Sequence, residues 1–138
     1  MHSTINNEFT SNNCINTGCI IYQIWSSASE HMSEREFIEQ MVILFDTAEV
    51  HKSQILYIDA FDFCYPISEN AMQQILKHFH RCNVNLVGIV SSSKLLGRIQ
   101  ISKLAKKFSN LDITLTILKT REEGLVWFNS VSNPAHSI

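Results

Sequence analysis

Apolar runs that alternate with amphipathic segments constrain the fold of this chain more than any other feature. Four of these runs are rich in β-branched or aromatic residues, as strands are: CIIYQIW at 19–25, ILYID at 55–59, NLVGIV at 85–90 and ITLTIL at 113–118. The segments between and after them place apolar side chains at helical spacing. Because strands that alternate with helices build mainly parallel sheets, this pattern predicts an α/β fold.

Two sequence motifs indicate where helices begin. Ser33 with Glu36, and Thr120 with Glu123, have the spacing of a capping box. In such a box a hydroxyl and a carboxylate bind the free N–H groups at a helix start. The helix that begins after Ser33 should end near residues 49–52.

The two ends of the chain set the expected limits of the domain. A short edge strand at 8–11 should pair antiparallel with the strand at 19–25, and the asparagine-rich stretch between them is typical of a turn. Residues 1–7 are expected to be loose and residues 130–138 to be a frayed tail. The prediction is therefore one domain over 8–129, with an N-terminal β-hairpin and a mixed, mostly parallel sheet of about five strands with helices.

Composition fits a globular protein with a single core. The chain has 138 residues, of which 45% are hydrophobic and 17% charged. No apolar run reaches the roughly 18 residues of a membrane span. The start of the chain, MHSTINNEFTSNN, has neither the basic nor the apolar region of a secretory signal. We therefore expect a cytoplasmic protein without a membrane span.

Charge is distributed unevenly along the chain, although the net charge is only −2. Residues 1–50 contain seven acidic residues and one basic residue, and residues 94–121 contain seven basic residues and one acidic residue. We interpret these as two solvated helix faces. The asymmetry also permits a charged partner or a homodimer. Nucleic acid is not an expected partner, because basic and aromatic binding motifs are missing.

The cysteines and histidines do not have the spacing of a metal site. Cys14 and Cys19 are five residues apart without a Cys-x-x-Cys or histidine pair, and His78 with Cys82 offers only two ligands on one helix face. We interpret these cysteines, and Cys64, as reduced thiols with a structural role. We expect no metal and no cofactor.

Polar side chains gather where the strands are expected to end. In parallel sheets the carboxyl ends of strands meet the N-termini of helices, and ligands usually bind there. Helix capping explains any single one of these side chains, because Ser, Thr and Asn favour cap positions. Together they form a candidate pocket or interface, which contains Asp59, Ser68, Glu69, Asn70, Ser91, Ser92 and Thr120.

The sequence does not contain the motifs of common catalytic schemes. No Walker loop, nucleophile elbow or dinucleotide-binding fingerprint occurs, and four glycines are few for a phosphate-cradling loop. We therefore expect a protein that is not an enzyme. A receiver-like phospho-acceptor at Asp59, with Ser91 and Lys119, stays open as an alternative, although WSSASE at 25–30 has no acidic pair to hold Mg²⁺. A second open alternative is a carrier of a small hydrophobic or anionic ligand, bound at the strand-edge pocket.

The element order and the corner ILYIDAFDFCYPISENAMQQIL resemble the STAS fold of bacterial anti-sigma factor antagonists. The chain is similar in particular to small STAS-like (SpoIIAA-like) bacterial proteins of the Bacteroidetes type. This likeness rests on a strand that ends in Trp25, on Asp59 ahead of the Pro-Ile-Ser helix start at 66–68, and on Trp127 in an acidic helix. It covers about residues 8–129.

The resemblance implies a regulatory protein that acts by protein–protein contacts at the start of one helix. In the antagonists an Asp-Ser-Ser-Gly stretch opens that helix, and a partner kinase phosphorylates its second serine. Here Ser68 matches the first serine, Glu69 takes the phosphorylated position and Asn70 replaces the glycine. We interpret Glu69 as favoured by the helix dipole rather than as a substitute for phosphate. The expected function is therefore that of a non-enzymatic binding or regulatory module that acts around Ser68.

Overall fold

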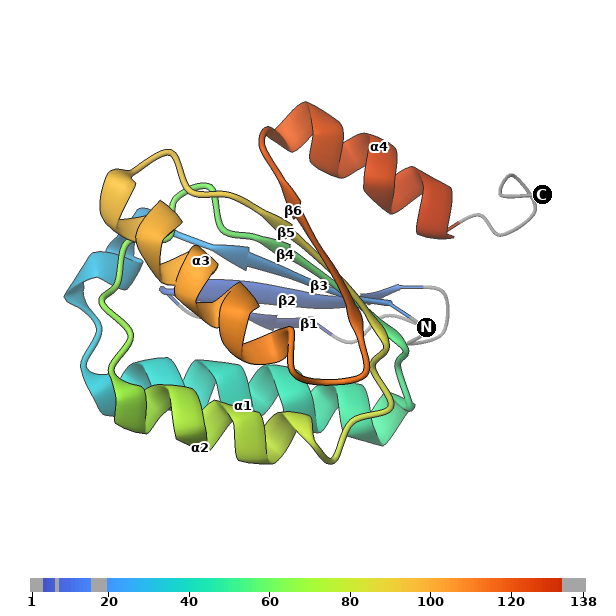
Figure 1. Cartoon of the computed structure of the whole chain (residues 1–138), viewed down its shortest axis with the longest axis horizontal. Helices are drawn as coiled ribbons and strands as arrows, with labels where there is room; N and C mark the ends of the chain where they lie inside the picture. The colour runs from blue at the N-terminus through green and yellow to red at the C-terminus, as the bar shows by residue number, and fades with distance from the viewer. Residues whose placement is uncertain (1–3, 7, 16–19, 133–138) are drawn as a thin grey trace.

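The structure of the chain is a computed structural model that describes residues 4–6, 8–15 and 20–132 (Figure 1). Its strands are β1 (Thr4–Asn6), β2 (Thr10–Ile15), β3 (Ile20–Trp25), β4 (Ile55–Asp59), β5 (Leu86–Val90) and β6 (Thr114–Leu118). Its helices are the 3₁₀ helix η1 (Ser27–His31) and the α-helices α1 (Glu34–His51), α2 (Glu69–Phe79), α3 (Leu95–Phe108) and α4 (Arg121–Ser132).

The six strands of the described residues form one sheet in the order β1-β2-β3-β4-β5-β6. β1, β2 and β3 pair antiparallel, whereas β3, β4, β5 and β6 pair parallel. The predicted fold class is therefore confirmed. The chain folds as α/β with a mixed, mostly parallel sheet and an N-terminal hairpin.

Helices cover the two faces of the sheet unequally. α1, α2 and α3 lie on one face and α4 lies on the other (Figure 1). Each parallel strand lies next to the strand that precedes it, so right-handed crossovers place all three connecting helices on the same side. α4 follows β6 and is not a crossover between two described strands, so this rule does not place it on the same side.

The main core lies between the sheet and the layer formed by α1, α2 and α3. Apolar residues of α1 recur at helical spacing and turn Phe37, Met41 and Leu44 toward the sheet, where all three are buried. The Phe37 ring lies 5.9 Å from that of Trp25 and 4.9 Å from that of Tyr65. Each such side chain contributes about 1.5–3 kcal/mol by burial, so this layer supplies most of the driving force for folding.

A smaller aromatic core lies under α4. Tyr57 of β4 packs against Trp127 and Phe128 of α4, with ring centroids 5.8 and 5.2 Å apart. Two glycines allow α4 to approach this closely. A Cβ at Gly88 would lie 2.6 Å from the Trp127 ring, and one at Gly124 would overlap the Tyr57 Oη.

The N-terminal segment differs from its prediction. A short strand, β1, lies inside residues 1–7, which were expected to be loose. The strand placed at 8–11 is β2 at 10–15, so the asparagine-rich stretch is a strand as far as residue 15 and not a turn. β2 pairs with a neighbour on each side, and these backbone hydrogen bonds outweigh the low strand propensity of asparagine. Residues 1–3, 7 and 16–19 lie outside the described part.

The predicted helix ends agree with the structure at α1 and agree in part at α4. Ser33 and Glu36 form the full capping box, and α1 ends at His51 as expected. At α4, Thr120 Oγ1 accepts a hydrogen bond from the Glu123 N–H (3.1 Å), but the Glu123 carboxylate binds the N–H of Lys119 instead (2.9 Å). α4 also continues to residue 132, and the rest of the expected tail lies outside the described residues.

Candidate functional site

The corner between β4 and α2, residues 60–68, is held by serines from two other segments. Ser29 of η1 accepts a hydrogen bond from the Cys64 N–H at its Oγ (3.1 Å). Ser92 donates its hydroxyl to the Phe63 carbonyl (2.8 Å). Both serines are buried, so these bonds satisfy loop backbone groups away from water and hold the corner in one conformation.

α3 fixes the last residue before α2 begins. Gln100 Oε1 accepts a hydrogen bond from the Ile67 N–H (2.9 Å), and Lys103 Nζ donates one to the Ile67 carbonyl (3.2 Å). Because Ile67 directly precedes Ser68, these two bonds set the position at which α2 starts relative to α3.

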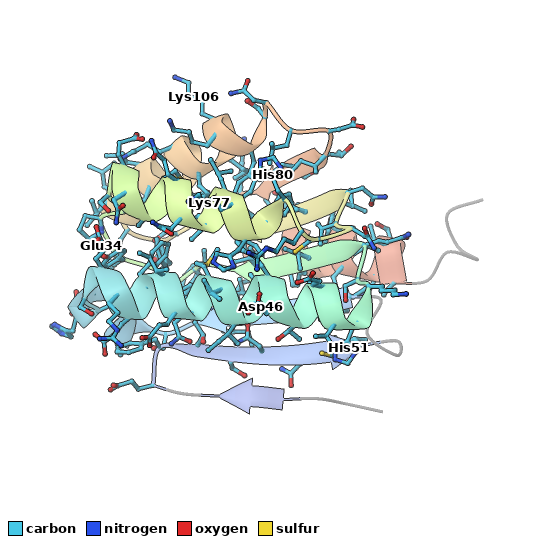
Figure 2. The ribbon with its side chains drawn as sticks, turned by 90° about the horizontal axis from the view of Figure 1, so that it is seen from below. Glu34, Asp46, His51, Lys77, His80 and Lys106 are labelled. Carbon is cyan, nitrogen blue, oxygen red and sulfur yellow. The ribbon has the colours of Figure 1, made fainter. Side chains whose placement is uncertain are left out.

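Ser68 caps α2 and also binds α1. Its Oγ accepts a hydrogen bond from the Ala71 N–H (3.0 Å), which confirms the predicted role of Ser68 as a helix cap. The same hydroxyl donates to one carboxylate oxygen of Glu34, and the other oxygen accepts from Asn70 Nδ2 (3.0 Å). One carboxylate thus joins the N-terminal ends of α1 and α2, which lie side by side in Figure 2.

Glu69 and Asn70 are exposed at this corner. The Glu69 carboxylate lies 3.4 Å from Lys107 Nζ of α3, in an ion pair that is largely solvated. Exposed pairs of this kind contribute about 0–1 kcal/mol. Glu69 also lies in the first turn of α2, where the helix dipole favours an acid.

Asp59 lies on the opposite side of the sheet from Ser68, in an ion pair with α4. Its Oδ2 is 2.9 Å from Arg121 Nε, and its Oδ1 accepts the Phe61 N–H (3.0 Å). The Asp59 side chain is only 7% exposed, whereas that of Arg121 is 44% exposed. The guanidinium also lies 3.6 Å from Asp62 and 4.3 Å from the Phe61 ring centroid. Asp59 therefore holds α4 against the end of β4.

Two tyrosines beside Asp59 resist ionisation. Burial raises the pKa of Tyr57 to about 12, with smaller contributions from Tyr22 and the Asp59 carboxylate. Burial likewise raises the pKa of Tyr22 above its usual range. Both phenols are therefore neutral at physiological pH.

The remaining predicted site residues act as caps and ladder partners. The backbone N–H of Ser91 donates to the Leu118 carbonyl (2.8 Å), which extends the pairing of β5 with β6. Ser92 accepts the Lys94 N–H (3.0 Å) at its Oγ, and Thr120 caps the start of α4. The structure therefore does not bring the predicted hydroxyls together around one common pocket. It places Ser68, Glu69 and Asn70 together and Asp59 with Thr120 on the α4 side.

The enclosed spaces near the corner are small and apolar. One lies among Trp25, Phe37, Phe63 and Ile67 and has a volume of about 20 Å³. Another lies deeper, near Phe79, and has a volume of about 10 Å³. Ligand pockets usually have volumes of roughly 300–1,000 Å³, so neither space holds more than a water-sized group.

The described cysteines and acidic residues do not converge on a metal ion. Within residues 4–6, 8–15 and 20–132, no three His, Cys, Asp or Glu side chains form a group that could hold one. Cys82 donates its thiol to the Phe45 carbonyl (3.2 Å), and burial raises its pKa to about 11. A thiol held in this way is a packing group rather than a nucleophile.

The sequence did not indicate four of the residues that build the corner. Glu34, Gln100, Lys103 and Ser29 each bind the corner from another segment of the chain. Of these four residues, Glu34 alone has a local signal in the sequence, because the first turn of a helix favours an acid. That signal does not separate it from Glu36, and so the contact is visible only in the folded chain.

Comparisons with family models, with curated proteins and with solved structures found no match for this chain. The resemblance to STAS-like proteins therefore stays a prediction. Among the described helices, none has the length and apolar character that crossing a membrane requires.

Proposed function

We propose that this chain is a non-enzymatic binding or regulatory module of the STAS-like type, and that it binds a protein partner at the start of α2. The observation that carries the proposal is the carboxylate of Glu34, which joins Ser68 and Asn70 to the first turn of α1. Preformed surfaces of this kind bind partners at a lower entropic cost than mobile ones.

The polar groups at the corner suit recognition rather than catalysis. Glu69 and Asn70 are exposed on a corner that Ser92, Gln100 and Lys103 hold in place. They present a carboxylate and an amide to the solvent, which are specific hydrogen-bonding groups.

The same geometry provides a means of regulation. The Ser68 hydroxyl is bonded to Glu34, so a negative charge placed on Ser68 would lie against the Glu34 carboxylate. Like charges at this distance repel, and a phosphate carries about −1.5 to −2 charges at neutral pH. Modification of Ser68 would separate the starts of α1 and α2 and change the surface.

The geometry favours the two alternative functions, a ligand carrier and a receiver, less than it favours a binding module. A carrier needs a cavity, and the enclosed spaces near the corner hold about 20 and 10 Å³. A receiver needs an accessible aspartate, and Asp59 is buried with both oxygens bonded. A phosphoryl donor would reach Asp59 only after Arg121 had moved away.

Affinity capture with matched variants tests the proposal. The bait is the whole chain, and the extract comes from the cells that make it. Asn70→Arg adds a cation at the corner, and His80→Arg adds the same charge at the opposite end of α2 (Figure 2). We expect a partner that the parent chain and His80→Arg retain and that Asn70→Arg and Ser68→Glu lose. A partner retained equally by all four chains contradicts the proposed surface.

A further inference from the structure

The outer edge of β6 carries backbone groups that point away from the sheet. β6 is the last strand, and within the described part of the chain its only strand partner is β5. Thr114 donates its N–H to the Asn85 carbonyl (2.9 Å), so Thr114 and every second residue after it face β5. The N–H and C=O groups of Leu115 and Ile117 therefore face outward, in position to pair with another strand.

The sequence of this edge has none of the usual protection against pairing. Edge strands commonly carry charged residues or proline, which prevent other strands from adding to them. β6 reads TLTIL and has neither. Among the residues that the structure describes, only the end of this edge is covered, because Glu123 accepts the outward N–H of Lys119 (2.9 Å). Ile117 is 40% exposed at this open edge.

Open grooves flank the edge on both faces of the sheet. The groove beside α3 has a volume of about 600 Å³ and is lined by Ala105, Lys106, Leu115 and Ile117, among others. The groove beside α4 has a volume of about 580 Å³, and Trp127 lies in its wall. Side chains of an added strand would point alternately into the two grooves, as in any sheet.

The groove beside α3 is lined by one basic side chain and by no acidic one among the described residues. Lys106 lines it and points away from α2 (Figure 2). Arg98, Ile99 and Lys106 also line an adjoining hollow of about 390 Å³. No described carboxylate forms an ion pair with Arg98 or Lys106. Glu122 and Glu123 lie in the other groove, on the α4 side.

These charges favour a foreign strand over a second copy of the chain. If two β6 strands paired antiparallel, their α3 helices would lie side by side across the symmetry axis. Arg98 and Lys106 of each copy would then face the same cations of the other copy, and like charges repel. A partner strand with acidic side chains would instead be attracted to these cations.

We propose that the outer edge of β6 binds an extended segment of a partner protein by strand addition, and that this segment carries acidic side chains toward α3. Its backbone would pair with the outward groups of Leu115 and Ile117. Its acidic side chains would reach Lys106 and Arg98, and its other side chains would lie on the α4 side. This surface is separate from the α2 corner, so a result that contradicts one proposal leaves the other unaffected.

Fluorescence anisotropy with the full chain and a labelled peptide tests this proposal. The probe is a peptide of about seven residues in which glutamate alternates with valine, a length typical of strands. We expect it to bind, and we expect binding to weaken as salt is added. A peptide with lysine in place of glutamate should bind at least about ten-fold more weakly, as should one with N-methyl groups along the pairing edge.

Variants of the chain separate backbone pairing from charge. Ile117→Pro removes an outward N–H at an edge position where proline is tolerated, and we expect about ten-fold weaker binding. Ile117→Thr keeps the N–H and serves as the matched control, with a change below about three-fold. Lys106→Glu should weaken binding of the glutamate peptide and strengthen binding of the lysine peptide. Asn70→Arg should leave the affinity for both peptides unchanged.

Three results would overturn the proposal. One is no binding of the glutamate peptide at millimolar concentration. Another is equal binding of the parent and N-methylated peptides, a comparison that holds even where Ile117→Pro fails to fold. The third is sedimentation of the chain as a dimer that Ile117→Pro dissociates, because the edge would then belong to a second copy.

Discussion

Glu34 links two helix starts through a single exposed carboxylate. Its two oxygens bind Ser68 and Asn70, so α1 and α2 share one hydrogen-bonded start. A carboxylate that accepts two hydrogen bonds in a fixed geometry couples the groups that donate them. The cap of α2 and the first turn of α1 should therefore respond to mutation together.

Replacing Ser68 by alanine removes both the cap and the bond to Glu34. We expect Ser68→Ala to lower the free energy of unfolding by about 1–2 kcal/mol, measured by urea denaturation. Glu34→Ala should have a smaller effect. The loss of stability in the double variant should be about 0.5–1 kcal/mol smaller than the sum of the losses in the two single variants. Additive losses in that cycle would show that the two side chains do not interact in solution.

The neutral Tyr57 side chain makes stability depend on pH in the alkaline range. Its pKa in the folded chain is about 12, above the ordinary value of 10.0, chiefly because the phenol is buried. A raised pKa means that the folded chain holds this proton more tightly than the unfolded chain does. The contribution is thus fully present below about pH 10 and is lost as the pH rises toward about 12.

Urea denaturation at several alkaline pH values measures this loss. The parent chain should lose stability more steeply between about pH 10 and 12 than Tyr57→Phe, which keeps the ring and has no proton to lose. Tyr22 and Tyr65 also have raised pKa values and remain in both chains, so the difference isolates Tyr57. Identical slopes in the two chains would contradict the burial of the Tyr57 hydroxyl.

At the scale of elements, α4 depends on a glycine in the middle of a strand. Gly88 lies in β5, where alanine would ordinarily be favoured over glycine because it loses less backbone freedom on folding. The Trp127 ring occupies the space that a Cβ would need, at 2.6 Å. The close packing of α4 on β5 thus outweighs the intrinsic preference of the strand.

Gly88→Ala should therefore destabilise the chain through α4 alone. We expect a loss of about 1–3 kcal/mol in the free energy of unfolding, together with a change in Trp127 fluorescence. In a Trp127→Ala background the same substitution should be neutral or slightly stabilising, because the clash is gone. An equal loss in both backgrounds would place the cause elsewhere in β5.

Charge is separated across the whole molecule. α2 lies between α1 and α3 in the helix layer (Figure 2). α1 carries the acids Glu34, Glu36, Glu39, Asp46 and Glu49, and α3 carries the bases Arg98, Lys103, Lys106 and Lys107. Five of the seven acids and four of the seven bases in the two charge blocks of the sequence thus lie on two separate sides of one layer.

This arrangement sets the form that self-association would take. A contact between α1 of one copy and α3 of another leads to rings or open chains where it is made once, and it closes a two-fold dimer where it is made twice about the symmetry axis. We expect the chain to be monomeric at physiological salt and to associate progressively when salt is lowered, because screening weakens such contacts. Analytical ultracentrifugation across a salt series measures this. A discrete dimer that is insensitive to salt would contradict the expectation.

Local signals explain how much of the fold could be predicted. β4 spans the predicted run 55–59, and α1 begins at its predicted capping box. Apolar runs, caps and helical periodicity involve neighbours in sequence, so they can be recognised without the fold. The asparagine-rich part of β2 was predicted as a turn, because its strand conformation comes from pairing on both sides.

The candidate site could be predicted only in part, for the same reason. Ser68 was expected to cap α2, and it does. The partners that define the site could not be expected, because Glu34 lies 34 residues from Ser68 and Arg121 lies 62 residues from Asp59. Contacts over such separations depend on how the helices are arranged on the sheet, and no local pattern encodes them.

The sequence by itself determined the alternation of strands and α-helices from β3 to α4, the α/β class and the separation of charge, because each follows from residue types and their spacing. Only the tertiary structure decided that Asp59 pairs with α4, that Glu34 joins two helix starts, and that β6 is left at an open edge. Those outcomes depend on strand order and on which face each helix covers. Packing of the whole chain sets both.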